Sequence, residues 1–368
     1  MKTSGGYFRR AAHLVLYWQD GQLVFENYAT GRATEADPLA CVILSFFDRW
    51  RQGKALERDM DDYTPASLHA SMRQLVRHGL LEHSVRHPRG QRSTRLASWD
   101  DWNPAAGFFH FSTKDTEFVI DATEEERHFR ARGRRMRVPS PVKHYPRAAQ
   151  IALPAAQRAG EFPSVLLARR TWRRFSRQPV TLAQLGTLLG LTGGVQRWLD
   201  VPPLGRLALK TSPSGGARHP IELYVLALGV AGLPRGIYHY AADRHRLERL
   251  RRGASAREAV RWLAGQHWFG GAAALVLMTA VMPRVQWKYQ FARAYRVVLA
   301  DAGHLCQTFY LVATWLGLAP FATMALGDSQ IERAIGVDGV NEVALYAAGV
   351  GVPPSDGRPD DNFAAGSM

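Results

Sequence analysis

The chain has 368 residues, 46% of them hydrophobic, and a formal net charge of +15. Its length suggests two domains, and its hydrophobic content excludes wholesale disorder. The only two cysteines, Cys41 and Cys306, exclude a disulfide framework or a cysteine metal site. The sequence has neither an apolar run of about 18 residues nor the pattern of a signal peptide, so we expect a cytoplasmic protein without a bound metal.

The N-terminal part of the chain reads as a small module of helices and short strands. Residues 38–50 are apolar in a helical pattern, and the Thr-Pro pair at residues 64–65 supplies the N-cap and first residue of a second helix. Gly79 ends that helix, a short strand follows, and residues 88–90 form a basic turn. This order is typical of a winged-helix module, which we place at residues 1–126.

A winged-helix outline raises the question of DNA binding. The second helix offers only Arg73 and Arg77 as basic residues that could read base edges, which is few for a recognition helix. We therefore expect the module to bind a peptide, and nucleic-acid binding is the weaker interpretation.

His110 lies at the end of an aromatic segment, residues 102–111. A histidine in this position could be a ligand. A single histidine among aromatic residues is more often packed in a core, so we favour a structural role for His110.

A basic stretch separates the module from the rest of the chain. Residues 127–147 contain seven arginines, one lysine and no acidic residue, together with a glycine and three prolines. This composition is typical of an inter-domain linker, which we place at residues 127–160. The linker could guide an acidic peptide or a nucleic acid, or it could be only a solvated connector.

From residue 161 to residue 354 the pattern changes to helices between apolar strands. Thr181 and Gln184 predict a capping box at the start of a helix, and an apolar seam predicts a long helix over residues 295–318. Residues 320–324 are expected to form a loop. Strands are predicted at residues 221–228, 237–240, 273–281 and 343–350.

Two segments of this second part point to a phosphorylated cofactor. Residues 169–175 contain four arginines and a threonine, and guanidinium forks with a hydroxyl are suited to binding a phosphate monoester. Residues 212–222 begin with small residues, which permit close backbone approach to a flat ligand, and run into a strand.

Four motifs in a fixed order give the second part a resemblance to a known family. They are Arg-Thr-x-Arg-x-Phe at 170–175, Pro-Ser-Gly-Gly-Ala-Arg-His-Pro at 213–220, Gly-Ile-Tyr-His-Tyr at 236–240, and Lys-Tyr at 288–289 followed by Tyr-Arg at 295–296 and Asp-Ala-Gly-His at 301–304. With these motifs the chain resembles the flavin-dependent nitroreductase superfamily. More narrowly, it resembles the SagB-type dehydrogenases, which act on ribosomally made peptides and also carry a winged-helix-like N-terminal module.

The resemblance implies an α+β fold, a central sheet wrapped by helices, with FMN at the interface of a homodimer. Arg170, Thr171 and Arg173 would hold the phosphate and ribityl chain. The remaining contacts implied by the resemblance are Pro213, Ser214 and Gly215 from the other subunit with Arg218 near them, and Ala322, Thr323 and Met324 near the reactive edge of the flavin.

Lys288 and Tyr289 match the Lys-Tyr pair that is implicated in proton removal in azoline-oxidising relatives. Dehydrogenation of a thiazoline or oxazoline requires departure of a hydride to the flavin and loss of a carbon-bound proton. The resemblance therefore implies that Lys288 is the base and that Tyr289 orients the substrate or relays the proton. Without the resemblance, both would be read as ordinary residues on a helix surface.

The expected function is an FMN-dependent dehydrogenase that matures a ribosomal precursor peptide, oxidising azolines made by a partner cyclodehydratase. One alternative reverses the electron flow and reduces dehydroamino acids, nitro compounds or quinones with NAD(P)H. The other alternative is a basic winged-helix DNA-binding protein with a flavin sensor domain.

The chain departs from the family pattern near its C-terminus. The basic residues that often complete the phosphate site have no clear counterpart after Val350, and Arg358 is the remaining candidate. Residues 355–368 read as a flexible tail.

Overall fold

The computed structural model describes residues 6–88, 96–117, 121–135, 155, 158–201 and 205–355. Contacts divide the chain into two compact units. The first comprises the chain up to Lys114 together with Gln286–Tyr295, and the second comprises Asp115–Val285 and the chain from Arg296 onward. The division falls earlier than the predicted boundary at residue 126, and it assigns a short segment from the second half of the sequence to the first unit.

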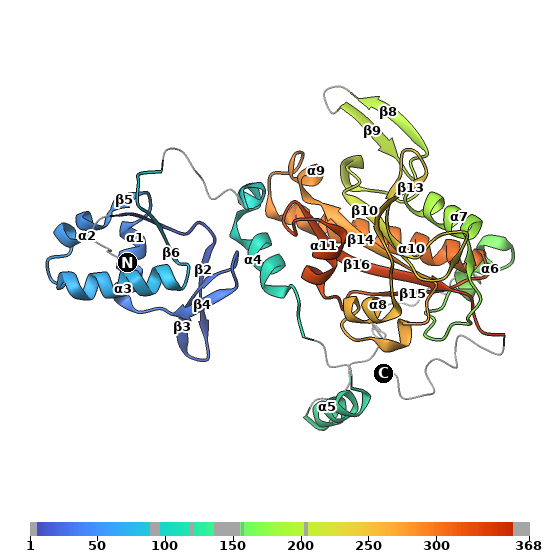
Figure 1. The fold of residues 1–368 in the computed structure, drawn as a ribbon, viewed down its shortest axis with the longest axis horizontal. Helices are drawn as coiled ribbons and strands as arrows, with labels where there is room; N and C mark the ends of the chain where they lie inside the picture. Colours follow the sequence, from blue (N-terminus) through green and yellow to red (C-terminus); the bar gives the residue numbers. More distant parts are fainter. Residues whose placement is uncertain are drawn as a thin grey trace, which may run out of the picture. The chain divides into compact units, whose positions relative to one another are not determined.

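The first unit contains two small antiparallel sheets and a set of helices (Figure 1, blue to cyan). One sheet has the order β5-β1-β6, from Arg51–Gln52, Tyr7–Arg10 and Leu81–Ser84, and the other has the order β2-β3-β4, from Leu14–Gln19, Gln22–Asn27 and Arg32–Glu35. The helices are α1 (Pro38–Phe46), α2 (Gly53–Asp59), α3 (Pro65–Arg77) and α4 (Asn103–Thr113), preceded by the 3₁₀ turn η2 (Ala97–Trp102). Phe8, Ile43 and Leu68 are fully buried in the core between the first sheet and α1–α3.

The local signals of the predicted helix–helix–strand order are confirmed. Thr64 caps α3, its hydroxyl accepting a hydrogen bond from Ser67 N at 3.3 Å, and Gly79 ends the turn after α3 with a φ of +69°. In the β5-β1-β6 sheet, the central strand is Tyr7–Arg10, from the N-terminal end of the sequence. Of the predicted wing, residues 89–95 lie outside the described residues, so the winged-helix assignment stays a prediction.

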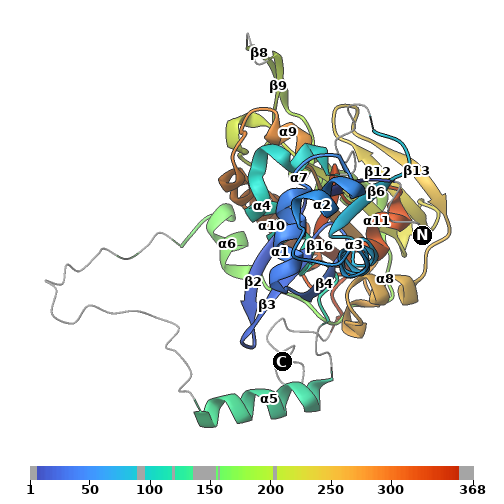
Figure 2. The same cartoon turned by 90° about the vertical axis from the view of Figure 1, so that its left-hand side faces the viewer.

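The second unit is built on a six-stranded sheet in which every neighbouring pair is antiparallel (Figure 1). The strand order is β13-β12-β10-β14-β16-β15, with bounds Arg246–Arg252, Gly236–Ala241, Ile221–Ala227, Ala274–Val281, Glu342–Gly351 and Ala319–Thr323. The helices are α5 (Ala122–Arg135), α6 (Glu161–Ala168), α7 (Leu182–Gly193), α8 (Ala256–Trp262), α9 (Met282–Gln286), α10 (Tyr295–Trp315) and α11 (Asp328–Ile335). A two-stranded hairpin, β8 (Arg197–Val201) and β9 (Gly205–Leu209), projects beyond the sheet in both views (Figures 1 and 2).

Helices pack on both faces of the central sheet. On one face, Leu226 and Leu277 join Trp262 of α8 and Ile331 of α11 in a single buried cluster. On the other face, α7 reaches the sheet at Gly193, which lies against Leu223. A sheet covered by helices in this way confirms the α+β fold.

The predicted caps and strands of this unit are also confirmed, with one exception. Thr181 and Gln184 form the capping box of α7. Residues 320–324, expected to be a loop, instead lie largely in β15, the edge strand next to β16. An edge strand tolerates Pro320, which lacks an N–H, and burial of Phe321 stabilises the pairing.

Part of the basic stretch at residues 127–147 is helical. Helix α5 occupies residues 122–135, and its Glu126 and Arg130 form an ion pair four residues apart. The first part of the predicted linker is therefore helical. Residues 136–154 and the predicted tail beyond residue 355 lie outside the described residues.

Among the residues that the structure describes, no helix combines the length and the apolar character needed to cross a membrane.

Gly349 in β16 tests how tightly the core is packed. A methyl group at this position would overlap the ring of Phe321, so Gly349→Ala should lower the free energy of unfolding by about 1–3 kcal/mol through overpacking. At Gly229 an added methyl group would lie at an ordinary 3.7 Å from Ala273 Cα, and Gly229→Ala should change the stability by less than about 0.5 kcal/mol. Urea denaturation measures both, and equal midpoints for the two variants would contradict the packing argument.

Candidate functional site

The arginine-rich segment is fixed between α10 and the edge of the sheet. The Thr171 hydroxyl lies 2.9 Å from the Tyr310 hydroxyl on α10, and the Arg169 guanidinium lies 5.5 Å from the centre of the Tyr310 ring. Main-chain bonds run from Trp172 N to Pro320 O and from Ser176 N to Val352 O, both at 2.8 Å. The backbone of this segment therefore has a defined position from which its arginines extend.

Arg170 and Arg173 differ in their surroundings. Arg170 is exposed, and its Nη1 donates to the carbonyls of Leu167 and Arg169 at 3.0 and 2.8 Å, at the end of α6. Arg173 is half-buried. A guanidinium carries five N–H groups in a planar fork, the geometry that suits a phosphate or a carboxylate.

The small-residue loop is bonded to the same helix. Ser214 Oγ donates to Asp301 Oδ2 at 2.5 Å, Gly215 N donates to Asp301 Oδ1 at 3.4 Å, and Ser212 Oγ lies 2.6 Å from Thr308 Oγ1. Asp301 is buried, and burial raises the pKa of its carboxyl although the bonds from Ser214 and Gly215 act in the opposite direction. Asp301 is thus the point at which the loop is attached to α10.

The backbone of this loop is strained. Gly216, Ala217 and His219 have φ values of +61°, +53° and +43°, and left-handed φ costs a non-glycine residue about 1–2 kcal/mol. At Gly215, a Cβ would overlap the side chain of Val297 on α10. Close approach to α10 by itself accounts for glycine at position 215. Strain of this kind is typical of ligand-binding loops.

Both predicted cofactor segments are therefore brought together on one helix. Their partners on α10 are Asp301 and Tyr310, nine residues apart, a distance of about 13 Å along an α-helix. Two motifs separated by some forty residues are thus both bonded by side chains to α10, and no motif predicted α10 as their common support.

The third predicted contact region lies partly in β15. The Thr323 hydroxyl accepts hydrogen bonds from Gln266 Nε2 and from Ala325 N, both at 3.1 Å, so it is engaged within the protein. Met324, directly after the strand, is 59% exposed. Of Ala322, Thr323 and Met324, the last presents the most open side chain.

Lys288 and Tyr289 belong to the first unit, unlike the other predicted site residues. They lie in a turn after α9 and not on a helix surface, and both are half-buried. The Lys288 ammonium is 5.4 Å from the centre of the Tyr289 ring. Their role in proton removal stays a prediction.

The turn is held by the aromatic segment of the first unit. The buried indole of Trp102 donates from Nε1 to Tyr289 O at 2.9 Å, and His110 Nδ1 lies 2.8 Å from the hydroxyl of Tyr295. The rings of Trp99 and His110 stack at 5.1 Å. Three aromatic residues of the first unit thus hold the segment that carries Lys288, at Tyr289 and at Tyr295.

His110 acts as part of this packing. Burial lowers its pKa to about 3, so the imidazole is neutral at physiological pH. Its stacking and its bond to Tyr295 agree with the structural role favoured from the sequence.

Gln286 was not recognised from the sequence. It is 5% exposed, and neither its Nε2 nor its Oε1 has a hydrogen-bond partner among the described residues. A buried amide without partners is typical of a place where a ligand or a water bonds. Its position two residues before Lys288 is the one feature of the sequence that could have pointed to it.

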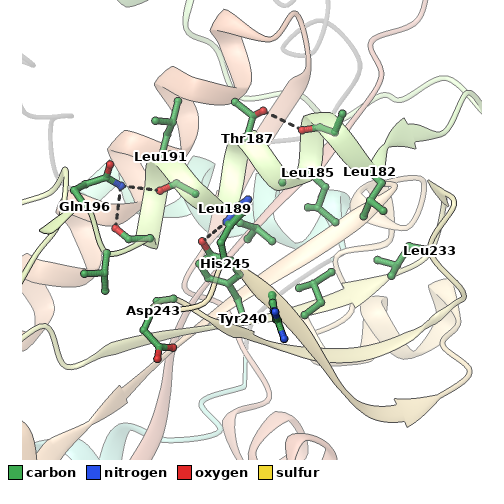
Figure 3. Close-up of a pocket in the computed structure, with 18 residues that line it drawn as sticks. Leu182, Leu185, Thr187, Leu189, Leu191, Gln196, Leu233, Tyr240, Asp243 and His245 are labelled. Carbon is green, nitrogen blue, oxygen red and sulfur yellow. Dashed lines mark hydrogen bonds between the residues drawn. The ribbon is translucent and has the colours of Figure 1, made fainter.

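A cavity of about 950 Å³ lies between α7 and the β12–β13 turn (Figure 3). Leucines of α7 face the pair formed by Tyr240 and His245, whose hydroxyl and Nδ1 are 2.7 Å apart. None of the residues predicted to hold a flavin lines this cavity. It is therefore separate from the arginine segment and the Ser214 loop.

The chain is similar in sequence to two known proteins. A protein of Methanocaldococcus jannaschii whose name assigns it to the nitroreductases is 31% identical over 171 residues, covering 46% of this chain and 82% of the relative. The trifolitoxin-processing protein TfxB of Rhizobium leguminosarum bv. trifolii is 33% identical over 145 residues, covering 38% of each chain.

The chain is also similar to proteins of known structure. A nitroreductase-like protein from Anabaena variabilis is 28% identical with a TM-score of 0.45, covering 52% of this chain and 38% of the other. The E. coli microcin synthetase McbBCD complex with truncated pro-MccB17 contains a chain that is 19% identical with a TM-score of 0.46, covering 65% and 95%. Both TM-scores lie below 0.5, so family membership rests on the sequence matches.

Residues 166–352, just over half of the chain, match the profile of the nitroreductase family. This range contains the arginine segment, the Ser214 loop, α10 and β15, and the chain therefore belongs to the nitroreductase family.

Proposed function

We propose that this protein is an FMN-dependent oxidoreductase that dehydrogenates thiazoline or oxazoline rings in a ribosomally made precursor peptide. The observation that carries the proposal is the attachment of both predicted cofactor segments to α10, through Thr171–Tyr310 and Ser214–Asp301. The similarity to a trifolitoxin-processing protein supports a peptide substrate. A cyclodehydratase would be the partner that makes the azoline.

The residues present fit the FMN phosphate in their chemistry. Arg170 is exposed and Arg173 half-buried on a segment whose backbone is fixed, and guanidinium groups bind phosphate oxygens by paired, charge-assisted hydrogen bonds. Arg170, Thr171 and Arg173 would hold the phosphate and ribityl chain, and the Ser214 loop of the other subunit would approach the ring. A bound flavin would supply the hydride acceptor for the oxidation.

The proton is handled by the chain itself. In the proposed reaction the azoline loses a hydride and a carbon-bound proton and becomes an aromatic azole. Lys288 takes the proton on Nζ, and the Tyr289 hydroxyl orients the substrate or relays the proton. Trp102 fixes the backbone of this pair by its bond to Tyr289 O.

We also propose that the protein is a homodimer. Helix α6 has no buried residue, and Phe162, Leu166 and Leu167 are 65%, 42% and 44% exposed. An apolar helix without a covered face is typical of a subunit interface. Because α6 directly precedes the arginine segment, a second copy covering it would lie near the proposed cofactor site.

The cofactor assignment predicts a specific pattern among neighbouring arginines. Arg170→Ala and Arg173→Ala should each weaken FMN binding by about tenfold or more, because each removes a charge-assisted contact to phosphate. Arg174 is an exposed arginine at a variable position of the same motif, and Arg174→Ala should retain FMN. The visible absorption spectrum and the chromophore released on denaturation measure the FMN content of the purified protein. A wild-type protein that is colourless and does not take up added FMN would contradict the proposal.

The base assignment predicts loss of turnover without loss of cofactor. Lys288→Met should lower the rate of azole formation from a synthetic thiazoline peptide by about 10²–10⁴-fold, the usual contribution of a general base, while the FMN content stays unchanged. The matched control is Lys54→Met, at an exposed position in α2. Mass spectrometry follows the loss of two hydrogens. Full activity of Lys288→Met would remove Lys288 from the mechanism, whereas NADPH consumption without azole formation would favour the reductase function.

The bond from Trp102 predicts a positioning effect. Trp102→Phe leaves Tyr289 O without its donor and should lower kcat by about tenfold, with a smaller change in KM, because a buried acceptor without a partner costs about 1–3 kcal/mol. Trp99→Phe removes similar bulk from the same cluster but keeps the Trp102–Tyr289 bond. Steady-state kinetics of both variants, with FMN content measured in parallel, separates positioning from packing. Equal losses of kcat would mean that only packing matters.

A further inference from the structure

A second cavity, of about 540 Å³, lies at the base of the β8–β9 hairpin and contains a dense group of charged side chains. Residues from β9, β10, β12, β13 and α9 line it, including Lys210, Glu222, His239, Glu248 and Arg284. Apart from Arg218, none of the residues assigned above to cofactor binding or proton transfer borders it. Its volume falls within the usual range for small-ligand sites.

Four of these side chains form a continuous chain of alternating charge. Arg284 Nη1 lies 2.5 Å from Glu222 Oε1, and His239 Nε2 lies 3.1 Å from Glu222 Oε2. The second ring nitrogen of His239 lies 2.9 Å from Glu248 Oε2. Arg284 also donates to His219 O at 3.0 Å, which ties the group to the end of the Ser214 loop.

The charges of these four side chains cancel one another. Hydrogen bonding to Glu222, opposed by burial and helped by Glu248, raises the pKa of His239 to about 9, so the imidazole is cationic at neutral pH. Burial alone would raise the pKa of Glu222, but bonds from His239 and Arg284 outweigh it and the pKa lies below its usual range. Two cations, His239 and Arg284, therefore neutralise two carboxylates, Glu222 and Glu248.

Lys210 is the charge that remains. It follows β9 directly, lines the same cavity and forms no hydrogen bond or ion pair with any residue that the structure describes. Burial lowers the pKa of its ammonium, and the Arg284 charge adds to this against the attraction of Glu222. Lys210 is half-buried, and an ammonium group partly withdrawn from water is stabilised by a bound anion.

The other charges of the cavity do not supply this anion. Asp243 lies 3.6 Å from Arg244 and is matched by it. Arg206 stacks on the Trp198 ring at 4.6 Å and adds further positive charge to the hairpin wall. The cavity thus has an excess of positive charge around Lys210.

We propose that this cavity is a binding site for a single carboxylate group, held by Lys210 and flanked by Arg284 and the Trp198–Arg206 wall. The carboxylates of the cavity are already paired with Arg284, His239 and Arg244, so none is left for the Lys210 ammonium. A carboxylate is a monoanion that would pair with one ammonium group by charge-assisted hydrogen bonds. The carboxylate can belong to a free small acid or to a peptide, at its C-terminus or on an acidic side chain.

The test uses the full chain and ligand-observed NMR with four probes: acetate, N-acetylglycine, its uncharged analogue N-acetylglycinamide, and inorganic phosphate. N-acetylglycine should show saturation transfer from the protein and N-acetylglycinamide should show none. Lys210→Met should weaken carboxylate binding about tenfold, Lys210→Arg should largely retain it, and Lys54→Met, at an exposed lysine, should not affect it. Binding of N-acetylglycine well above that of acetate would identify a peptide as the source of the carboxylate, and equal binding a free acid.

Three results would overturn the proposal. They are equal binding of N-acetylglycine and its amide, unchanged binding in Lys210→Met, and displacement of the carboxylates by phosphate at lower concentration. A loss of binding in Lys210→Met that Lys210→Arg does not rescue would also count against it, because a retained cation should suffice. This measurement depends on neither the FMN content nor the azoline turnover. A failure of this proposal can therefore be distinguished from a failure of the proposed function.

Discussion

The buried carboxylate of Asp301 is the interaction on which the candidate cofactor site depends. A buried carboxylate is stable only when its oxygens are hydrogen-bonded, and the donors here are Ser214 Oγ and Gly215 N. The loop that supplies these donors continues through three residues with left-handed φ. The favourable bonds to α10 offset that strain, so helix and loop each require the other.

Much of this fold follows from signals that act over a few residues. The Thr64 cap of α3, the capping box of α7 and the apolar runs of β10, β14 and β16 could be predicted because a cap or a strand depends on its immediate neighbours in the sequence. The arginine segment and the Ser214 loop could likewise be singled out by residue type. Their attachment to Tyr310 and Asp301 could not, because nothing local in α10 marks those two side chains as partners.

The features that the sequence did not predict are formed by distant residues. Trp102 and Tyr289 are separated by 187 positions, and Glu222 meets Arg284 and His239 only after β10, β12 and α9 have assembled. The sequence predicts a loop at residues 320–324 because this apolar run is short and begins with a proline, and only its place at the sheet edge beside β16 makes it part of a strand.

The residues proposed for proton transfer fold with the first unit, although they come from the second half of the sequence. Residues 286–295 follow α9 and pack with the aromatic segment of the first unit. Within that unit, Trp102 bonds to the main chain of Tyr289 and His110 to the hydroxyl of Tyr295. Because both bonds are made by one aromatic cluster, the packing of that cluster sets the conformation of the segment that carries Lys288.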